Sequence, residues 1–140
     1  FTFPFALGAS LALLHDVFFT IAFIGVMQIK PSIPVVAALL TVIGYSINDT
    51  IVIFDRIRDT LPEGSSIVPD ITDMAITQTL SRTIITSLAT VLVIVALIFG
   101  GATSLYDFAV IILFGILVGT YSSIFIASHF VQWYVEWRSS

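Results

Sequence analysis

Four long apolar stretches, separated by short polar connectors, dominate this sequence of 140 residues. A helix of about 20 apolar residues is long enough to cross the hydrocarbon core of a bilayer. Hydrophobic residues make up 58% of the chain and charged residues only 10%, whereas about a quarter of the residues in soluble domains are charged. The sequence therefore excludes a water-soluble globule and predicts an all-α membrane protein.

Hydrophobic length and turn residues set the bounds of the four predicted spans, at approximately residues 5–27, 34–54, 84–100 and 105–135. Asp70, with Asp73 three residues later, is typical of a helix N-cap, so the third helix is expected to begin there, ahead of its span. Ser104 with Asp107 predicts a capping box that opens the fourth helix. Because the chain begins with Phe1, we expect residues 1–140 to be one transmembrane domain fragment.

Lysine and arginine predict the orientation of the spans. Four crossings put both ends of the chain and the longest connector on one side of the membrane. That side carries Arg56, Arg58, Arg82 and Arg138, whereas the opposite connectors carry Lys30 alone. The positive-inside rule therefore places both ends in the cytoplasm. The last span is expected to close with an aromatic belt at the interface, formed by Trp133, Tyr134 and Trp137.

Composition also limits the chemistry of the chain. There is no cysteine, and the formal net charge is -4. A thiol nucleophile and a Cys-based zinc site are therefore excluded, and no nucleic-acid partner is expected, because the chain has no basic surface for a phosphate backbone. The two histidines, one within a span and one near a span end, are poor evidence for a metal site. Neither a metal nor a bound cofactor is implied.

A few polar residues lie inside the predicted spans, where a charge costs roughly 2.5 to 3.5 kcal/mol on insertion scales. His15 and Asp16 are near the middle of the first span, and Asn48 and Asp49 are in the second. One interpretation is a proton path through these groups. The other is structural, with hydrogen bonds of about 1 kcal/mol each holding helices together. The sequence favours function for Asp49 and leaves the His15–Asp16 pair open.

Other polar and small residues recur at helical spacing. Arg82 either snorkels to the cytoplasmic interface or, if its helix begins at Asp70 and tilts, reaches the depth of Asp49. Two spans carry polar stripes, made by Thr41, Tyr45 and Asn48 in the second and by Thr79, Thr83, Thr86 and Thr90 in the third. The fourth span has a small residue at every fourth position, which predicts close helix packing at Gly115, Gly119, Ser123 and Ala127.

The sequence GYSINDTIVIFDRIR, from Gly44 to Arg58, resembles the fourth-helix motif of the SecF family, the smaller half of the bacterial SecDF protein-export factor. Residues 13–17, 78–87 and 115–128 resemble the third, fifth and sixth helices of that family. The resemblance implies a membrane domain of the RND superfamily. The chain would then hold the third to sixth helices, the C-terminal part of a six-helix half, of SecF or of the SecF half of a fused SecDF.

The resemblance also implies a function: a non-enzymatic subunit of the bacterial inner membrane that couples the proton-motive force to protein export. The implied partners are SecD, or the SecD half of the same chain, the SecYEG channel, the translocating preprotein and the lipid bilayer. Asp49 matches the transmembrane aspartate of the family's proposed proton path, and Arg82 matches its arginine. His15, Asp16 and Asn48 are predicted to accompany them, and the coupling ion stays open between H⁺ and Na⁺.

Two alternatives remain at this point. In the first, the chain is a structural subunit whose polar groups only hold helices together. In the second, it is an intramembrane aspartyl protease, which needs two carboxylates facing each other at one depth. Asp16 and Asp49 meet the depth requirement, but the Gly-x-Gly-Asp signature of that class is missing.

Overall fold

The structure, a computed structural model, describes residues 3–60, 69–101 and 103–139, and the regular elements in this part of the chain are helical. The long helices are α1 (Phe3–Val26), α2 (Ile33–Thr60), α3 (Pro69–Phe99) and α4 (Tyr106–Ser122). A 3₁₀ turn, η1 (Thr103–Leu105), precedes α4. A π-helical segment, η2 (Ser123–Ala127), joins α4 to α5 (Ser128–Ser139).

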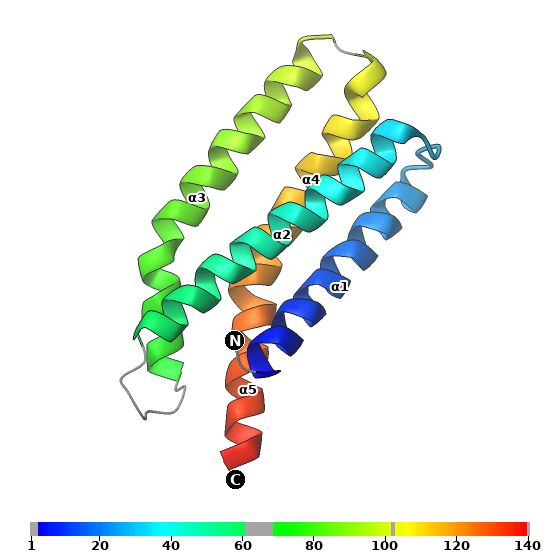
Figure 1. The fold of residues 1–140 in the computed structure, drawn as a ribbon. Coiled ribbons are helices and arrows are strands. Elements are labelled where there is room, and N and C mark those ends of the chain that lie inside the picture. Colours follow the sequence, from blue (N-terminus) through cyan, green and yellow to red (C-terminus); the bar gives the residue numbers. More distant parts are fainter. Residues whose placement is uncertain (1–2, 61–68, 102, 140) are drawn as a thin grey trace.

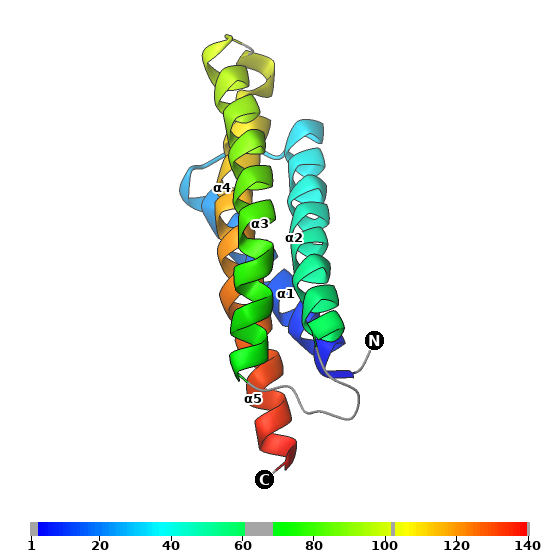
Figure 2. The same ribbon diagram turned by 90° about the vertical axis from the view of Figure 1, so that its left-hand side faces the viewer.

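The helices form an antiparallel bundle with α2 and α4 at its centre (Figures 1 and 2). Both central helices pack against each other and against α1 and α3, which flank them. The start of α1, the end of α2, the start of α3 and α5 all lie at one end of the bundle (Figure 1). This arrangement is the one that four successive crossings of a membrane produce.

Four helical segments in the described part of the chain are long and apolar enough to cross a membrane: Phe5–Val26, Ile33–Thr60, Asp73–Phe99 and Thr103–Ile126. Large apolar side chains are exposed on their outer faces, among them Leu14 at 65%, Val93 at 68% and Leu117 at 60%. A water-soluble bundle would bury such side chains, so lipid or further helices cover them. On α5, Trp133 and Trp137 are exposed, whereas the side chain of Tyr134 lies outside the described residues.

Two predicted helix starts need correction. The helix α3 begins at Pro69, so Asp70 lies in its first turn instead of forming the N-cap. There its carboxylate still faces the positive end of the helix dipole. The N-cap of α4 is Leu105, and no side chain caps this helix. The predicted capping box of Ser104 and Asp107 is therefore wrong. The 3₁₀ turn places Ser104 inside a helical element, where it is not the capping residue.

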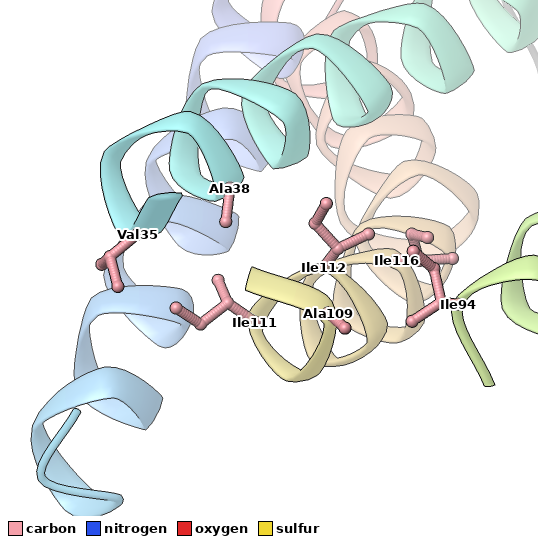
Figure 3. Close-up of a cluster of buried hydrophobic side chains, with 7 residues drawn as sticks. All are labelled: Val35, Ala38, Ile94, Ala109, Ile111, Ile112 and Ile116. Atoms are coloured by element: carbon pink, nitrogen blue, oxygen red, sulfur yellow. The ribbon is translucent and has the colours of Figure 1, made fainter. Parts of the chain in front are cut away.

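Two apolar clusters hold the bundle together, one toward each end. The cluster nearer the chain termini joins α1, α2 and α3 through Phe5, Ala12, Ile53, Phe54, Ile57 and Ala75. The other joins α2, α3 and α4 through Val35, Ala38, Ile94, Ala109, Ile111, Ile112 and Ile116 (Figure 3). Along each helix the buried polar residues lie between these clusters. The bundle therefore has a polar layer between two apolar layers.

Candidate functional site

Asp16 is at the centre of the polar layer. Its side chain is fully buried, at 0% exposure, and its Oδ2 accepts a hydrogen bond from the Ser46 hydroxyl of α2. Gly119 of α4 faces this contact: an added Cβ there would lie 3.7 Å from Ser46 Cβ and 3.8 Å from Asp16 Oδ2, at ordinary van der Waals distance. Three helices thus meet around one carboxylate.

His15 lies at the edge of the same cluster. Its Nδ1 is 3.2 Å from Asp16 Oδ1, and its side chain is 23% exposed. The ring packs 4.5 Å from the ring of Phe19 and 6.1 Å from that of Tyr121, measured between centroids. The predicted His15–Asp16 contact therefore exists, with the carboxylate buried and the imidazole facing outward.

Asp49 lies one turn beyond Ser46 on the same face of α2, because residues three apart on a helix are neighbours. It is 5% exposed, and its Oδ2 has no hydrogen-bond partner among the described residues; the same holds for the hydroxyl of Thr50. Buried polar atoms are nearly always paired, so an unpaired carboxylate oxygen requires an explanation. Chemically, such an oxygen can accept a proton or a cation.

A chain of hydroxyl groups crosses the bundle one turn from Asp49. The phenol of Tyr45 on α2 lies 2.5 Å from Ser87 Oγ on α3, and Ser87 Oγ lies 3.0 Å from Thr120 Oγ1 on α4. Each hydroxyl can donate and accept. The three residues therefore form a polar connection between α3 and the two central helices.

Arg82 is exposed on α3 and lines a cleft between α2 and α3. Arg56 Nε donates to Gln78 Oε1 at 2.6 Å, which fixes the register of the two antiparallel helices. Val52 and Arg82 are each four residues from this pair, about 6 Å along the helix axis. Arg82 is therefore level with Val52, one turn from Asp49, and in the described part of the chain no ion pair joins Arg82 to Asp49.

The predicted site residues are thus only partly brought together. His15 and Asp16 are in contact, and Asp49 lies on the turn of α2 that follows Ser46. Asn48, by contrast, is exposed. Ser46 was missed by sequence reasoning, although its position three residues before Asp49 places it on the same helical face.

The small residues of α4 lie at its contact with α2. An added Cβ at Gly115 would be 2.7 Å from Val42 Cγ1, closer than side chains can pack, and Gly119 faces Tyr45 and Ser46. Ser123 is fully buried in the π-helical segment. Ala127 ends that segment, and its side chain lies outside the described residues. Close approach of the two central helices therefore depends on Gly115, whereas a Cβ at Gly119 would meet its neighbours at ordinary contact distance.

Comparison with known proteins decides the family. The family described as protein export membrane protein SecD/SecF, C-terminal, matches residues 1–137. This chain belongs to the SecD/SecF C-terminal family. Among its relatives, the protein translocase subunit SecF of Vibrio alginolyticus is 50% identical over 129 residues, which are 91% of this chain and 41% of that protein. SecF of Desulfurispirillum indicum is 50% identical over 139 residues, 96% of this chain and 43% of that protein.

Solved structures of SecDF have the same fold. The crystal structure of SecDF in the super-membrane-facing form matches with a TM-score of 0.89 and 43% identity, over 99% of this chain and 19% of that one. SecDF of Thermus thermophilus, described as a translocon-associated membrane protein, matches with a TM-score of 0.87 and 44% identity, over 100% of this chain and 19% of that one. The SecD/SecF-type chain is an integral membrane protein, and it spans about two fifths of the length of its SecF relatives.

Proposed function

We propose that this chain is the part of a SecF subunit that couples ion movement across the bacterial inner membrane to protein export, with Asp49 as the ion-binding carboxylate. The observation that carries the proposal is the buried Oδ2 of Asp49, which has no hydrogen-bond partner among the described residues. Ionisable groups inside membrane spans are costly and are by default functional. The relatives are named protein translocase subunits, and this is a transport function without enzymatic chemistry.

Arg82 is the cationic partner of Asp49 in this proposal. It lies about one turn, roughly 4.5 Å of helix rise, from the level of Asp49, and the guanidinium group stands at the end of a long flexible side chain. A small tilt or slide of α3 would bring the guanidinium to the carboxylate and displace a bound proton. The sparse packing of α3 in the bundle is compatible with such a movement.

The further partners follow from the family: SecD or a SecD half, the SecYEG channel and the translocating preprotein. By the distribution of lysine and arginine, the end of the bundle that carries Arg56 and Arg58 is cytoplasmic. We propose H⁺ as the coupling ion, with Na⁺ as the alternative. Carboxylate and hydroxyl oxygens such as those of Asp49 and Thr50 can bind either ion.

The test is preprotein translocation into membrane vesicles that contain the full-length complex, with and without an ion gradient. Asp49→Asn keeps the size and most of the hydrogen-bonding capacity of the side chain but cannot titrate. We expect it to abolish gradient-dependent translocation and to leave ATP-driven translocation intact. Asp107→Asn, at an exposed aspartate near the start of α4, is the matched control and should behave as wild type. Separate H⁺ and Na⁺ gradients identify the ion.

The structural alternative makes the opposite prediction. If Asp49 only holds helices together, Asn at this position preserves translocation in both conditions. The protease alternative has less support, because Asp16 is engaged by the Ser46 hydroxyl and by His15. Asp16 is thus not free to activate a water molecule opposite Asp49.

A further inference from the structure

A polar cleft of about 320 Å³ opens between α2 and α3 near the end of the bundle that carries Arg56. Its walls carry two acidic and two basic side chains, Asp55, Asp59, Arg56 and Arg82, together with Gln78. These side chains are exposed. Because the charges of the walls balance, the cleft can hold water and pass either a proton or a cation without a large electrostatic barrier.

The inner end of the cleft is formed by Val52, which is half-buried. Val52 follows Asp49 by three residues on α2, so the two side chains are neighbours on the helix surface. The cleft therefore stops one apolar side chain short of a buried carboxylate with an unpaired oxygen. On the opposite wall, Thr79 is 8% exposed, and Thr83 one turn further is 4% exposed.

We propose that this cleft is the aqueous passage between Asp49 and the cytoplasm, through which an ion released by the carboxylate leaves, and that Val52 is the apolar barrier between water and the carboxylate. The inference rests on the proposed function of Asp49. Hydrophobic constrictions gate ion pathways by excluding water. A single valine is a thin barrier, which a small movement of α3 relative to α2 would open.

The other side of α2 has the opposite character. An apolar groove between α1 and α2, of about 380 Å³, is lined by residues that include Leu13, Ile47 and Ile51. Ile51 and Val52 are consecutive on α2 and therefore lie at the same depth to within about 1.5 Å. One side chain faces the polar cleft, and the other faces the apolar groove. This pair allows a comparison in which depth is held constant.

Cysteine accessibility tests the aqueous passage directly, because the chain has no cysteine of its own. Val52→Cys and Ile51→Cys are made in the full-length complex, with any cysteines elsewhere in the complex replaced, and in inside-out vesicles, which present the cytoplasmic face. The probe is a membrane-impermeant methanethiosulfonate with a sulfonate group. We expect Val52→Cys to react about tenfold faster or more than Ile51→Cys, since the reactive thiolate forms in water and not against lipid. Gln78→Cys, at the cleft wall, should react fastest.

Equal rates for the two variants, or no reaction at Val52→Cys while Gln78→Cys is labelled, would overturn the inference. If Val52→Cys fails to assemble, Thr79→Cys on the opposite wall is compared in the same way with its neighbour Leu80→Cys. Leu80 is exposed and does not line the cleft.

The labelling outcome does not depend on the role of Asp49. If Asp49→Asn keeps gradient-dependent translocation, the proposed function fails while the labelling difference can still stand. If the labelling difference is absent while Asp49→Asn loses gradient-dependent translocation, the passage to the cytoplasm lies elsewhere and the role of Asp49 remains. A barrier role for Val52 is tested by Val52→Ser, which should increase ion leak through the complex, whereas Ile51→Ser should leave the leak unchanged.

Discussion

Replacing Gly115 by alanine is expected to force the two central helices apart. An added Cβ at Gly115 would lie 2.7 Å from Val42 Cγ1 and 3.0 Å from Val42 Cβ. Val42 is 1% exposed and belongs to the packed face of α2, so it has little space into which to move. The contact lies on the α2–α4 interface, which also carries Ser46 and Gly119 of the polar layer.

The expected magnitude follows from two opposing effects. Alanine in place of glycine in a helix interior stabilises the helix by about 1 kcal/mol, whereas overpacking a well-packed site costs roughly 1 to 3 kcal/mol. Gly115→Ala should therefore lower the free energy of unfolding by up to about 2 kcal/mol. At Gly44, also in a helix, an added Cβ meets nothing within 4 Å, so Gly44→Ala should gain about 1 kcal/mol.

The assay is denaturant or thermal unfolding of the full-length protein in lipid–detergent mixtures, with Gly44→Ala as the control. Adding Val42→Ala to Gly115→Ala removes both Cγ atoms and should recover stability, with a coupling of about 0.5 to 3 kcal/mol between the two positions. The packing argument is refuted if Gly115→Ala is as stable as Gly44→Ala, or if the second substitution at Val42 recovers nothing.

Two further predictions concern the polar layer. Ser46→Ala removes the donor to the buried Asp16 and should destabilise the protein by about 1 to 3 kcal/mol, whereas Ser10→Ala, at an exposed hydroxyl bonded to its own helix, should change stability by less than about 0.5 kcal/mol; equal effects in unfolding assays would contradict the contact. Ser87→Ala and Thr120→Ala each break the hydroxyl chain at a cost of about 0.6 to 2 kcal/mol. Because the two residues share a hydrogen bond, the double variant should cost less than the sum in a double-mutant cycle, and strict additivity would argue against the chain.

Helix number and order could be predicted from the sequence because spans of apolar residues are long and unambiguous. The register of the buried faces could not. The polar stripe of Thr41, Tyr45 and Asn48 suggested one face of α2, but the structure buries the neighbouring positions Val42, Ser46 and Asp49 and leaves Thr41 and Asn48 exposed. In a membrane the outward face of a helix is as apolar as its inward face, so hydrophobic periodicity does not show which face is buried.

The site residues show a similar division. The buried carboxylates Asp16 and Asp49 could be found because a charge inside a span is costly and rare. The hydroxyls of Ser46 and Ser87 could not, since serine and threonine are common in membrane helices and bond as readily to their own backbone. The depth of Arg82 depends on where α3 begins. The helix is unbroken from Pro69, and Arg82 is an exposed residue within it that lines the same cleft as Val52.

No feature of the sequence predicts the π-helical segment. It interrupts the predicted span from residue 105 to residue 135, just after the glycines of α4. The backbone N–H of Ser123 still bonds to the carbonyls of Gly119 and Thr120, so the α-helical hydrogen bonding continues up to the start of the π-helical segment. Such segments often occur at functional sites, and this one begins beside the polar layer.

The central claim is that Asp49 binds and releases an ion, and the most direct measurement is infrared difference spectroscopy of the full-length complex in lipid as the pH is raised. The account predicts a carboxylic-acid C=O band that disappears on deprotonation in the wild type, is missing in Asp49→Asn and is retained in Asp107→Asn. An unchanged difference spectrum in Asp49→Asn would show that Asp49 does not titrate and would contradict the account.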